Sequence, residues 1–218
     1  MSARRSGRLV IIAVCLMVVC TCRTGTTKLS DEETKLSARI EFPETVLAEI
    51  KKSGTNLRQL STVDDGGQGI LAAGVTIDVS QEEAVAAVEH LRERLGYGYL
   101  VFISERHFGL EPDNVSVLRG TDQYEMLRVM QTNGWNYDIS PETVIERVKL
   151  WDSRYGLDIY GAAFDWLEAR FERAPADMMA FAREVYEFCP DVVDQGTETV
   201  EALANEMART NSVYLWWD

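Results

Sequence analysis

The chain is poor in the residues that build most catalytic and redox sites. Its 218 residues include only two histidines and four cysteines, and three of the cysteines lie within the first 22 residues. Cys189 therefore stands alone in the remaining chain, which excludes an intrachain disulfide or a cysteine-rich zinc site there. A single thiol at a helix end is typical of a core residue, and we expect Cys189 to be one.

Catalytic motifs are also missing. The sequence contains no G-x-S-x-G elbow, no H-E-x-x-H pair and no phosphate-binding glycine-rich loop. His90 and His107 stand at no metal-ligand spacing, so we expect both to be structural or solvated. Any acid or base chemistry would have to come from carboxylates, and none are paired locally for it.

Positive charge is scarce. Lys and Arg number 22 against 35 Asp and Glu, which gives a formal net charge of −13 at pH 7. Such a surface repels phosphate backbones, so nucleic acid is not an expected partner. The acidic charge keeps an exported protein soluble, or it matches a basic protein partner; the sequence leaves both open.

The N-terminus is typical of an export signal. Arg4, Arg5 and Arg8 precede an apolar run at residues 9–19, which is shorter than the ~20 residues of a transmembrane helix. Cys20 and Cys22 lie where a bacterial lipoprotein signal places its lipidated cysteine, although Cys20 lacks the usual small residue before it. We predict a signal peptide over residues 1–22 and a lipid-anchored protein of the bacterial cell envelope. A periplasmic or secreted protein is the alternative, with membrane contact only through the lipid or the signal.

Removal of residues 1–22 would take three arginines and no acids, leaving a net charge of −16. Residues 23–40 are polar without a sustained apolar period, so we predict a tether there. Residues 41–218 fit a single α/β domain.

Caps and apolar periods predict helices at the following places: Ser80–Leu95, Asp122–Asn133, Ser140–Tyr155, Pro175–Phe188, one capped by Thr197, and a weaker one near residues 43–52. Apolar runs predict strands at residues 75–79, 99–103, 115–118, 157–172 and 213–217, with a helix from Phe164 as the alternative for part of the fourth. The fold class is therefore α+β or α/β, with a mixed sheet of about five strands covered by helices.

Two C-terminal blocks are unusual. One runs from Phe188 to Gly196 and contains Cys-Pro-Asp, a second aspartate three residues on, and Gln-Gly; the other is Leu215-Trp216-Trp217-Asp218. With Asn136-Tyr137-Asp138, and Gly161 with Asp165, they make residues 96–218 resemble the bacterial family "domain of unknown function 4253". The resemblance implies a compact α/β domain and no reaction.

The same blocks supply the candidate site. Asp191 and Asp194 follow a helix C-terminus, where the helix dipole disfavours negative charge, so both need compensation. Together with Asp165 and Asp218 they could hold Mg²⁺ or Ca²⁺. Alternatively, Asp191 caps the turn after Pro190 and Asp194 braces the Gln195-Gly196 turn. The full set of binding candidates is Asp165, Asp191, Asp194, Gln195, Trp217, Asp218, Asn136 and Tyr137.

Two functions of different classes follow. The first is a non-catalytic acidic protein-interaction module, comparable by fold and charge to inhibitor or immunity proteins. The alternative is a divalent-metal-dependent hydrolase that uses the aspartate cluster. Small-molecule binding near Trp135 and Tyr137 is a third possibility.

Overall fold

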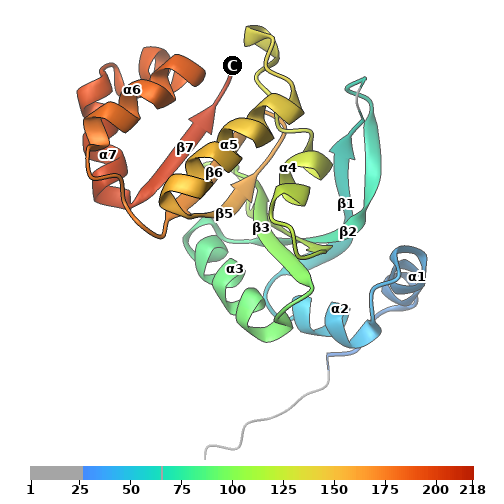
Figure 1. The fold of residues 1–218 in the computed structure, drawn as a ribbon. Helices are drawn as coiled ribbons and strands as arrows, with labels where there is room; N and C mark the ends of the chain where they lie inside the picture. The colour runs from blue at the N-terminus through green and yellow to red at the C-terminus, as the bar shows by residue number, and fades with distance from the viewer. Residues whose placement is uncertain (1–26, 65) are drawn as a thin grey trace, which may run out of the picture.

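The computed structural model describes residues 27–64 and 66–218. Its centre is a sheet with the strand order β1-β2-β4-β3-β5-β6-β7 (Figure 1). The strands are β1 Thr55–Val63, β2 Gly69–Val79, β3 Tyr99–Glu105, β4 Asp113–Arg119, β5 Leu157–Ala162, β6 Trp166–Phe171 and β7 Ser212–Trp216. Neighbouring strands are antiparallel except β3 and β5, which are parallel. The predicted mixed sheet with helical cover is confirmed, but it has seven strands rather than five.

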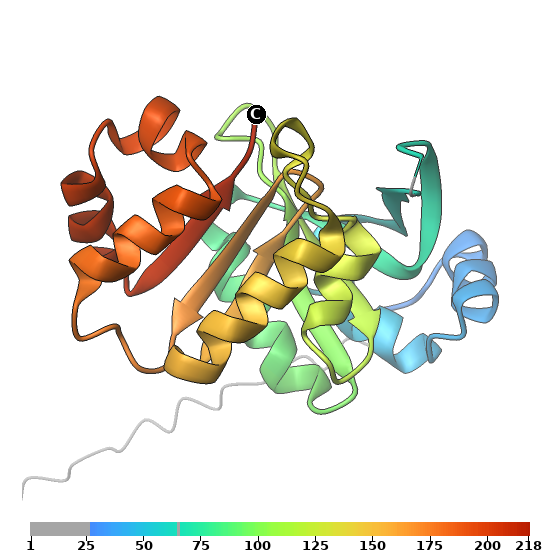
Figure 2. The ribbon, with the colours of Figure 1, turned by 45° about the horizontal axis from the view of Figure 1, so that its top comes forward.

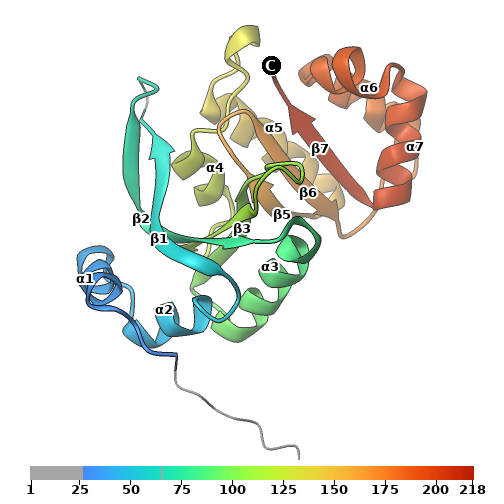
Figure 3. The same cartoon turned by 180° about the vertical axis from the view of Figure 1, so that it is seen from behind.

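Helices lie on both faces of this sheet. They are α1 Asp31–Ile40, α2 Glu44–Ile50, α3 Gln81–Leu95, α4 Tyr124–Met130, α5 Pro141–Tyr155, α6 Met178–Phe188 and α7 Val200–Thr210. Helix α3 covers one face through contacts with β3 and β4, and α4 and α5 cover the other (Figures 1 and 3). Helices α6 and α7 flank the β7 end of the sheet. Within residues 27–64 and 66–218, no helix combines the length and the apolar character that crossing a membrane requires.

Local signals explain most helix starts. The Ser140 hydroxyl accepts from the Thr143 amide, and Pro141 occupies the first turn of α5. Helix α7 begins at Thr199, whose hydroxyl accepts from the Ala202 amide. The predicted cap at Thr197 is wrong, because Thr197 ends a short π-helical segment, η2 (Val192–Thr197).

The predicted tether over residues 23–40 is corrected where the structure describes it. Residues 31–40 form α1, which starts with a Ser30–Glu33 capping box. Leu36 and Ile40 are buried in the core, so this segment belongs to the folded domain. The predicted signal peptide at residues 1–22, with Cys20 and Cys22, lies outside the described residues.

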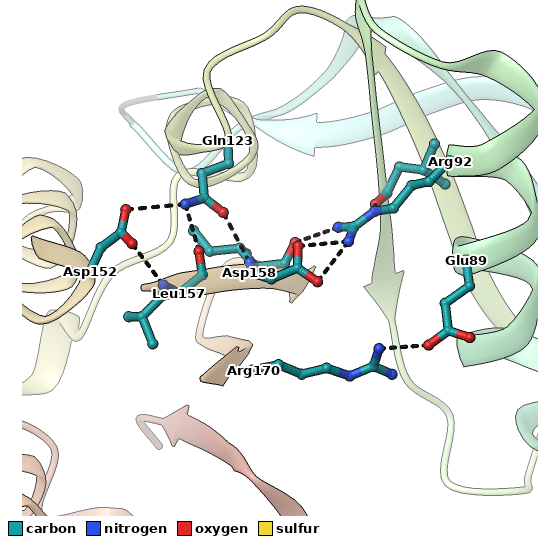
Figure 4. Close-up of polar contacts among 9 residues, drawn as sticks. Glu89, Arg92, Gln123, Asp152, Leu157, Asp158 and Arg170 are labelled. Carbon is teal, nitrogen blue, oxygen red and sulfur yellow. Dashed lines mark hydrogen bonds and ion pairs between the residues drawn. The ribbon is translucent and has the colours of Figure 1, made fainter. Parts of the chain in front are cut away.

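Strand pairing is sparse between β3 and β5, where only Ile103 and Gly161 are in register. Side chains bridge the remaining gap (Figure 4). From α3, the Arg92 guanidinium donates to the carbonyl of Val101 at 3.0 Å and to that of Ile159 at 2.6 Å. From the opposite face, the Gln123 amide accepts from the Ile159 amide at 3.0 Å and donates to the Leu157 carbonyl at 2.8 Å. These side chains satisfy main-chain groups that a neighbouring strand would otherwise pair.

At the β7 edge, a thiol contacts the last residue of the strand. Cys189 is buried, as expected, and lies just past α6. Its Sγ donates to the Trp216 carbonyl at 3.0 Å and lies 3.3 Å from the Trp216 amide, which donates to it. Burial raises the pKa of this thiol to about 12, which keeps it protonated and poorly nucleophilic at neutral pH.

Candidate functional site

A cavity of about 730 Å³ opens at the end of the molecule that carries the C-terminus. We call it the C-terminal pocket. Four separate segments meet there: the β1–β2 hairpin, the connection from α4 into α5, the β5–β6 turn and the residues after β7 (Figures 1 and 3). The lining residues are Asp64, Gly66, Gly67, Gln131, Asn133, Trp135, Asn136, Pro141, Glu142, Phe164, Asp165, Trp217 and Asp218.

One wall is the connection between α4 and α5, which is fixed to the β5–β6 turn. The Thr132 hydroxyl donates to the Ala163 carbonyl at 2.7 Å, and the Asn133 amide donates to the Phe164 carbonyl at 2.8 Å. The Asn133 side chain then accepts from the main-chain amide of Trp135 at 2.9 Å. Residues 135–137 form a short 3-10 helix, η1, that leaves the Trp135 side chain 74% exposed.

The floor is Trp217. Its side chain is only 3% exposed and packs edge-on against Phe188, with ring centroids 5.8 Å apart. Its indole also lies directly on Gly134, where a β-carbon would come within 2.8 Å of the ring. The backbone conformation does not require glycine at this position, because Gly134 has an ordinary negative φ. Glycine is required because the indole approaches too closely for a β-carbon. Trp217 is therefore a packed part of the core, whereas Trp135 is accessible to a ligand.

Asp191 lies behind this wall and joins three segments. Its Oδ1 accepts from the Tyr137 hydroxyl at 2.6 Å and from the Gln195 side-chain amide at 3.0 Å, and its Oδ2 accepts from the Asp218 main-chain amide at 3.0 Å. Burial raises the pKa of Asp191, but these three donors outweigh it and the net shift is downward. The hydrogen bond to Asp191 in turn raises the pKa of the Tyr137 hydroxyl to about 12.

Asp194 has a different environment. It is exposed and accepts from the Tyr186 hydroxyl at 2.9 Å, away from the Asp191 contacts. Among residues 27–64 and 66–218, no group of three or more His, Cys, Asp or Glu side chains is arranged to hold a metal ion. The divalent site built from Asp165, Asp191, Asp194 and Asp218 is therefore not assembled, because Asp191 already has three protein donors and Asp194 has turned toward α6.

The pocket is acidic. Its lining contains the carboxylates of Asp64, Glu142, Asp165 and Asp218, and the described lining residues include no Lys, Arg or His. Partial burial raises the pKa of Asp165, and the charge of Asp218 raises it further, against one main-chain hydrogen bond that lowers it. The Asp165 and Asp218 carboxylates thus repel each other, with no cation among the described lining residues to offset them.

The structure brings part of the predicted set together. Asp165, Trp217, Asp218 and Asn136 line the pocket, and Asn136 donates to the main-chain oxygen of Asp218. Tyr137, Asp191 and Gln195 lie behind the wall and support it. Asp194 takes no part.

Sequence reasoning missed several lining residues. Glu142 follows the proline that starts α5, and Phe164 lies in a turn that was expected to continue a strand. Asp64 precedes a glycine turn, and its carboxylate accepts from the amides of Gly66 and Gln68. No local signal marks Phe164, because only the reversal between β5 and β6 brings it to the pocket.

Searches of the curated proteins and of the solved structures return no match. A family model does match, over residues 114–218, and is described as "Domain of unknown function (DUF4253)". The matched region begins inside β4 and contains every pocket residue except the three of the β1–β2 hairpin. The resemblance predicted for residues 96–218 is therefore confirmed, over a slightly shorter range. Residues 114–218 of the chain thus match the model of the DUF4253 family.

Proposed function

We propose that the protein is a non-catalytic acidic module that binds a basic segment of another protein, with one Lys or Arg side chain entering the C-terminal pocket. The observation that carries this proposal is the pocket lining: four carboxylates and two exposed aromatic rings, with no described cationic residue among them. The net charge of −13 attracts the same kind of partner over a longer range.

The dimensions and the chemistry of the pocket support a single cationic side chain. A volume of about 730 Å³ is within the range of ligand sites, which is roughly 300–1,000 Å³. Trp135 and Phe164 offer ring faces on which a guanidinium or an ammonium can lie, and such contacts contribute about 0.5–2 kcal/mol. Asp165 supplies a partly buried carboxylate, where a charge-assisted hydrogen bond is stronger than at an open surface.

Two further parts of the hypothesis depend on other evidence. An inhibitor-like or immunity-like role rests on analogy of fold and charge. Export to the cell envelope rests on residues 1–22. The divalent-metal hydrolase is not carried forward, because Asp191 and Asp194 bond different tyrosines and no metal-ligating group is assembled among residues 27–64 and 66–218.

The test is a titration of the full-length protein with N-acetyl-arginine amide, followed by tryptophan fluorescence. N-acetyl-citrulline amide, which has nearly the same shape without the charge, is the matched probe. We expect saturable binding of the arginine probe only, and about tenfold weaker binding by Asp165→Asn, since one charge-assisted hydrogen bond contributes about 1.5–3 kcal/mol. Glu201→Gln on exposed α7 is the control variant and should bind like wild type.

The pH dependence has a defined sign. The pKa of Asp165 is raised, so its carboxylate becomes neutral at a higher pH than an ordinary aspartate as the solution is acidified. Binding of the arginine probe should weaken over that interval in wild type and change less in Asp165→Asn. Equal binding of both probes, or no effect of Asp165→Asn, would contradict the proposal.

A further inference from the structure

A second surface feature is a strained apolar turn between β3 and β4. Phe108 and Leu110 are 73% and 90% exposed, and the Leu110 amide donates to the His107 carbonyl at 3.0 Å. Phe108 and Gly109, between them, both have positive φ angles, of 51° and 82°. A four-residue turn in which both central residues have positive φ strongly favours Asn followed by Gly at those two positions. A bulky phenylalanine at the first of them is an outlier.

The base of this turn is rigid. Asp113 is fully buried and accepts from the Arg106 guanidinium at 3.3 Å and from the His107 main-chain amide at 2.9 Å. Arg106 also pairs with Glu168 of β6 at 2.5 Å, and the His107 ring contacts the Pro112 carbonyl at 2.7 Å. These contacts hold both ends of the loop on the sheet, while Phe108 and Leu110 at its tip are exposed to solvent.

The fold itself gives no reason for Phe108. A single exposed apolar side chain is ordinary, but here exposure coincides with backbone strain that Asn at the same position would relieve. Neither Phe108 nor Leu110 belongs to the hydrophobic core or to the residues packed against it. The side chains therefore contribute little to folding and are available for contact with another molecule.

The charge around the turn indicates what that molecule is. Glu105 and Glu111 are exposed on either side of it. Partial burial raises the pKa of Glu105, and the nearby carboxylates of Asp165 and Asp113 add to this against the opposing effect of His107. Asp165 lines the C-terminal pocket, so carboxylates lie both beside the turn and in the pocket. Strands β3, β5 and β7 run in the same direction, so loop 106–112 and the C-terminus lie at the same end of the sheet (Figure 2).

We propose that the turn at residues 107–110 docks an apolar side chain of the same basic partner segment whose cationic side chain enters the C-terminal pocket. This inference rests on the proposed function for the identity of the partner. A protein segment with basic and apolar residues fits an apolar tip between carboxylates. An anionic membrane fits it poorly, because Glu105 and Glu111 repel the headgroups.

The experiment uses the full-length protein and two synthetic peptides that are identical in their Arg and Lys residues. One peptide carries Leu at the intervening positions and the other carries Ser. Wild type should bind the Leu peptide about tenfold more tightly than the Ser peptide. Phe108→Asn should remove that advantage while binding the Ser peptide as wild type does, and it should melt at the same temperature as wild type or higher, because Asn suits the positive φ.

The outcomes separate the two proposals. If neither peptide binds, both proposals fail. If both peptides bind equally and Asp165→Asn weakens them, only the docking turn is overturned. A lower melting temperature for Phe108→Asn would show that Phe108 serves the fold and would also overturn it. Stronger binding of wild type than of Phe108→Asn to phosphatidylglycerol vesicles would also overturn the docking proposal, because it would assign the turn to a membrane.

Discussion

Replacing Asp191 by asparagine changes one oxygen into an amide nitrogen at the point where three segments meet. The carboxylate is 3% exposed and accepts from Tyr137, Gln195 and the Asp218 amide. An asparagine has one acceptor oxygen. If that oxygen keeps the Tyr137 and Gln195 bonds, the new amide group points at the Asp218 N–H, and two donors face each other.

The size of the effect follows from these bonds. A hydrogen bond to a charged group contributes about 1.5–3 kcal/mol, and a buried donor left without an acceptor costs a further ~1–3 kcal/mol. We therefore expect Asp191→Asn to lower the free energy of unfolding by about 3 kcal/mol. For a domain of this size, that is a fall of roughly 6–12 °C in melting temperature.

Acid titration adds a second readout. The folded-state pKa of Asp191 lies below its unfolded value, so the carboxylate stabilises the fold fully above about pH 4 and loses this effect as the pH falls through the folded pKa. The stability difference between wild type and Asp191→Asn should be full at pH 7 and should narrow in stronger acid. Denaturant melts at several pH values measure it.

Asp194→Asn is the matched control, three residues along the same segment. Asp194 is exposed and bonds only the Tyr186 hydroxyl, so its replacement should change stability by less than about 0.5 kcal/mol. Adding Tyr137→Phe to Asp191→Asn should cost little more than Asp191→Asn alone, since their shared bond is already altered. Equal melting temperatures for the two aspartate variants would refute the assigned role of Asp191.

Three further predictions concern stability and reactivity. Gly134→Ala should destabilise by about 1–3 kcal/mol in denaturant melts, because its methyl group must displace the Trp217 indole; a silent variant would mean that the floor can move. Arg92→Met should cost about 2 kcal/mol, because it loses the bonds to β3 and β5. Arg94→Met, an exposed residue of the same helix that pairs with the Glu49 side chain, should cost less than about 0.5 kcal/mol; similar losses for the two variants would argue against the bridging role. Cys189 should resist a disulfide exchange reagent at pH 8 until the protein unfolds, and fast labelling of the native protein would contradict its raised pKa.

Sequence reasoning worked best where the signal is local. Helix α5 follows from a cap, an apolar period and a glycine stop, all within about 16 residues. Helix α3 has the apolar period and the glycine stop, but the Ser80 hydroxyl donates to the Glu83 carboxylate and makes no cap bond to a main-chain amide. Strand β1 was missed because it is an edge strand with two register irregularities, so its polar and apolar residues do not alternate cleanly. The sequence predicts one strand over residues 157–172, whereas the chain reverses direction at residues 163–165 between β5 and β6. The turn is hidden because apolar and polar residues alternate both before and after it.

The pocket could not be predicted in the same way. Its lining comes from four segments that span most of the chain, and their approach is decided by the order of strands in the sheet. Likewise, the sequence marks Asp191 and Asp194 as a pair but cannot show which of them turns inward. That choice depends on Tyr137, which is 54 residues distant from Asp191.

The contact between Cys189 and Trp216 has a consequence for assembly. A sheet normally exposes unpaired amide and carbonyl groups along its outermost strand, where another chain can pair and start aggregation. Here the thiol takes up both main-chain groups of Trp216, and at the opposite edge the irregularities of β1 interrupt the pairing pattern. At the β7 edge the buried thiol thus occupies one position where a further strand could pair, and at the β1 edge the register shifts interrupt the regular ladder.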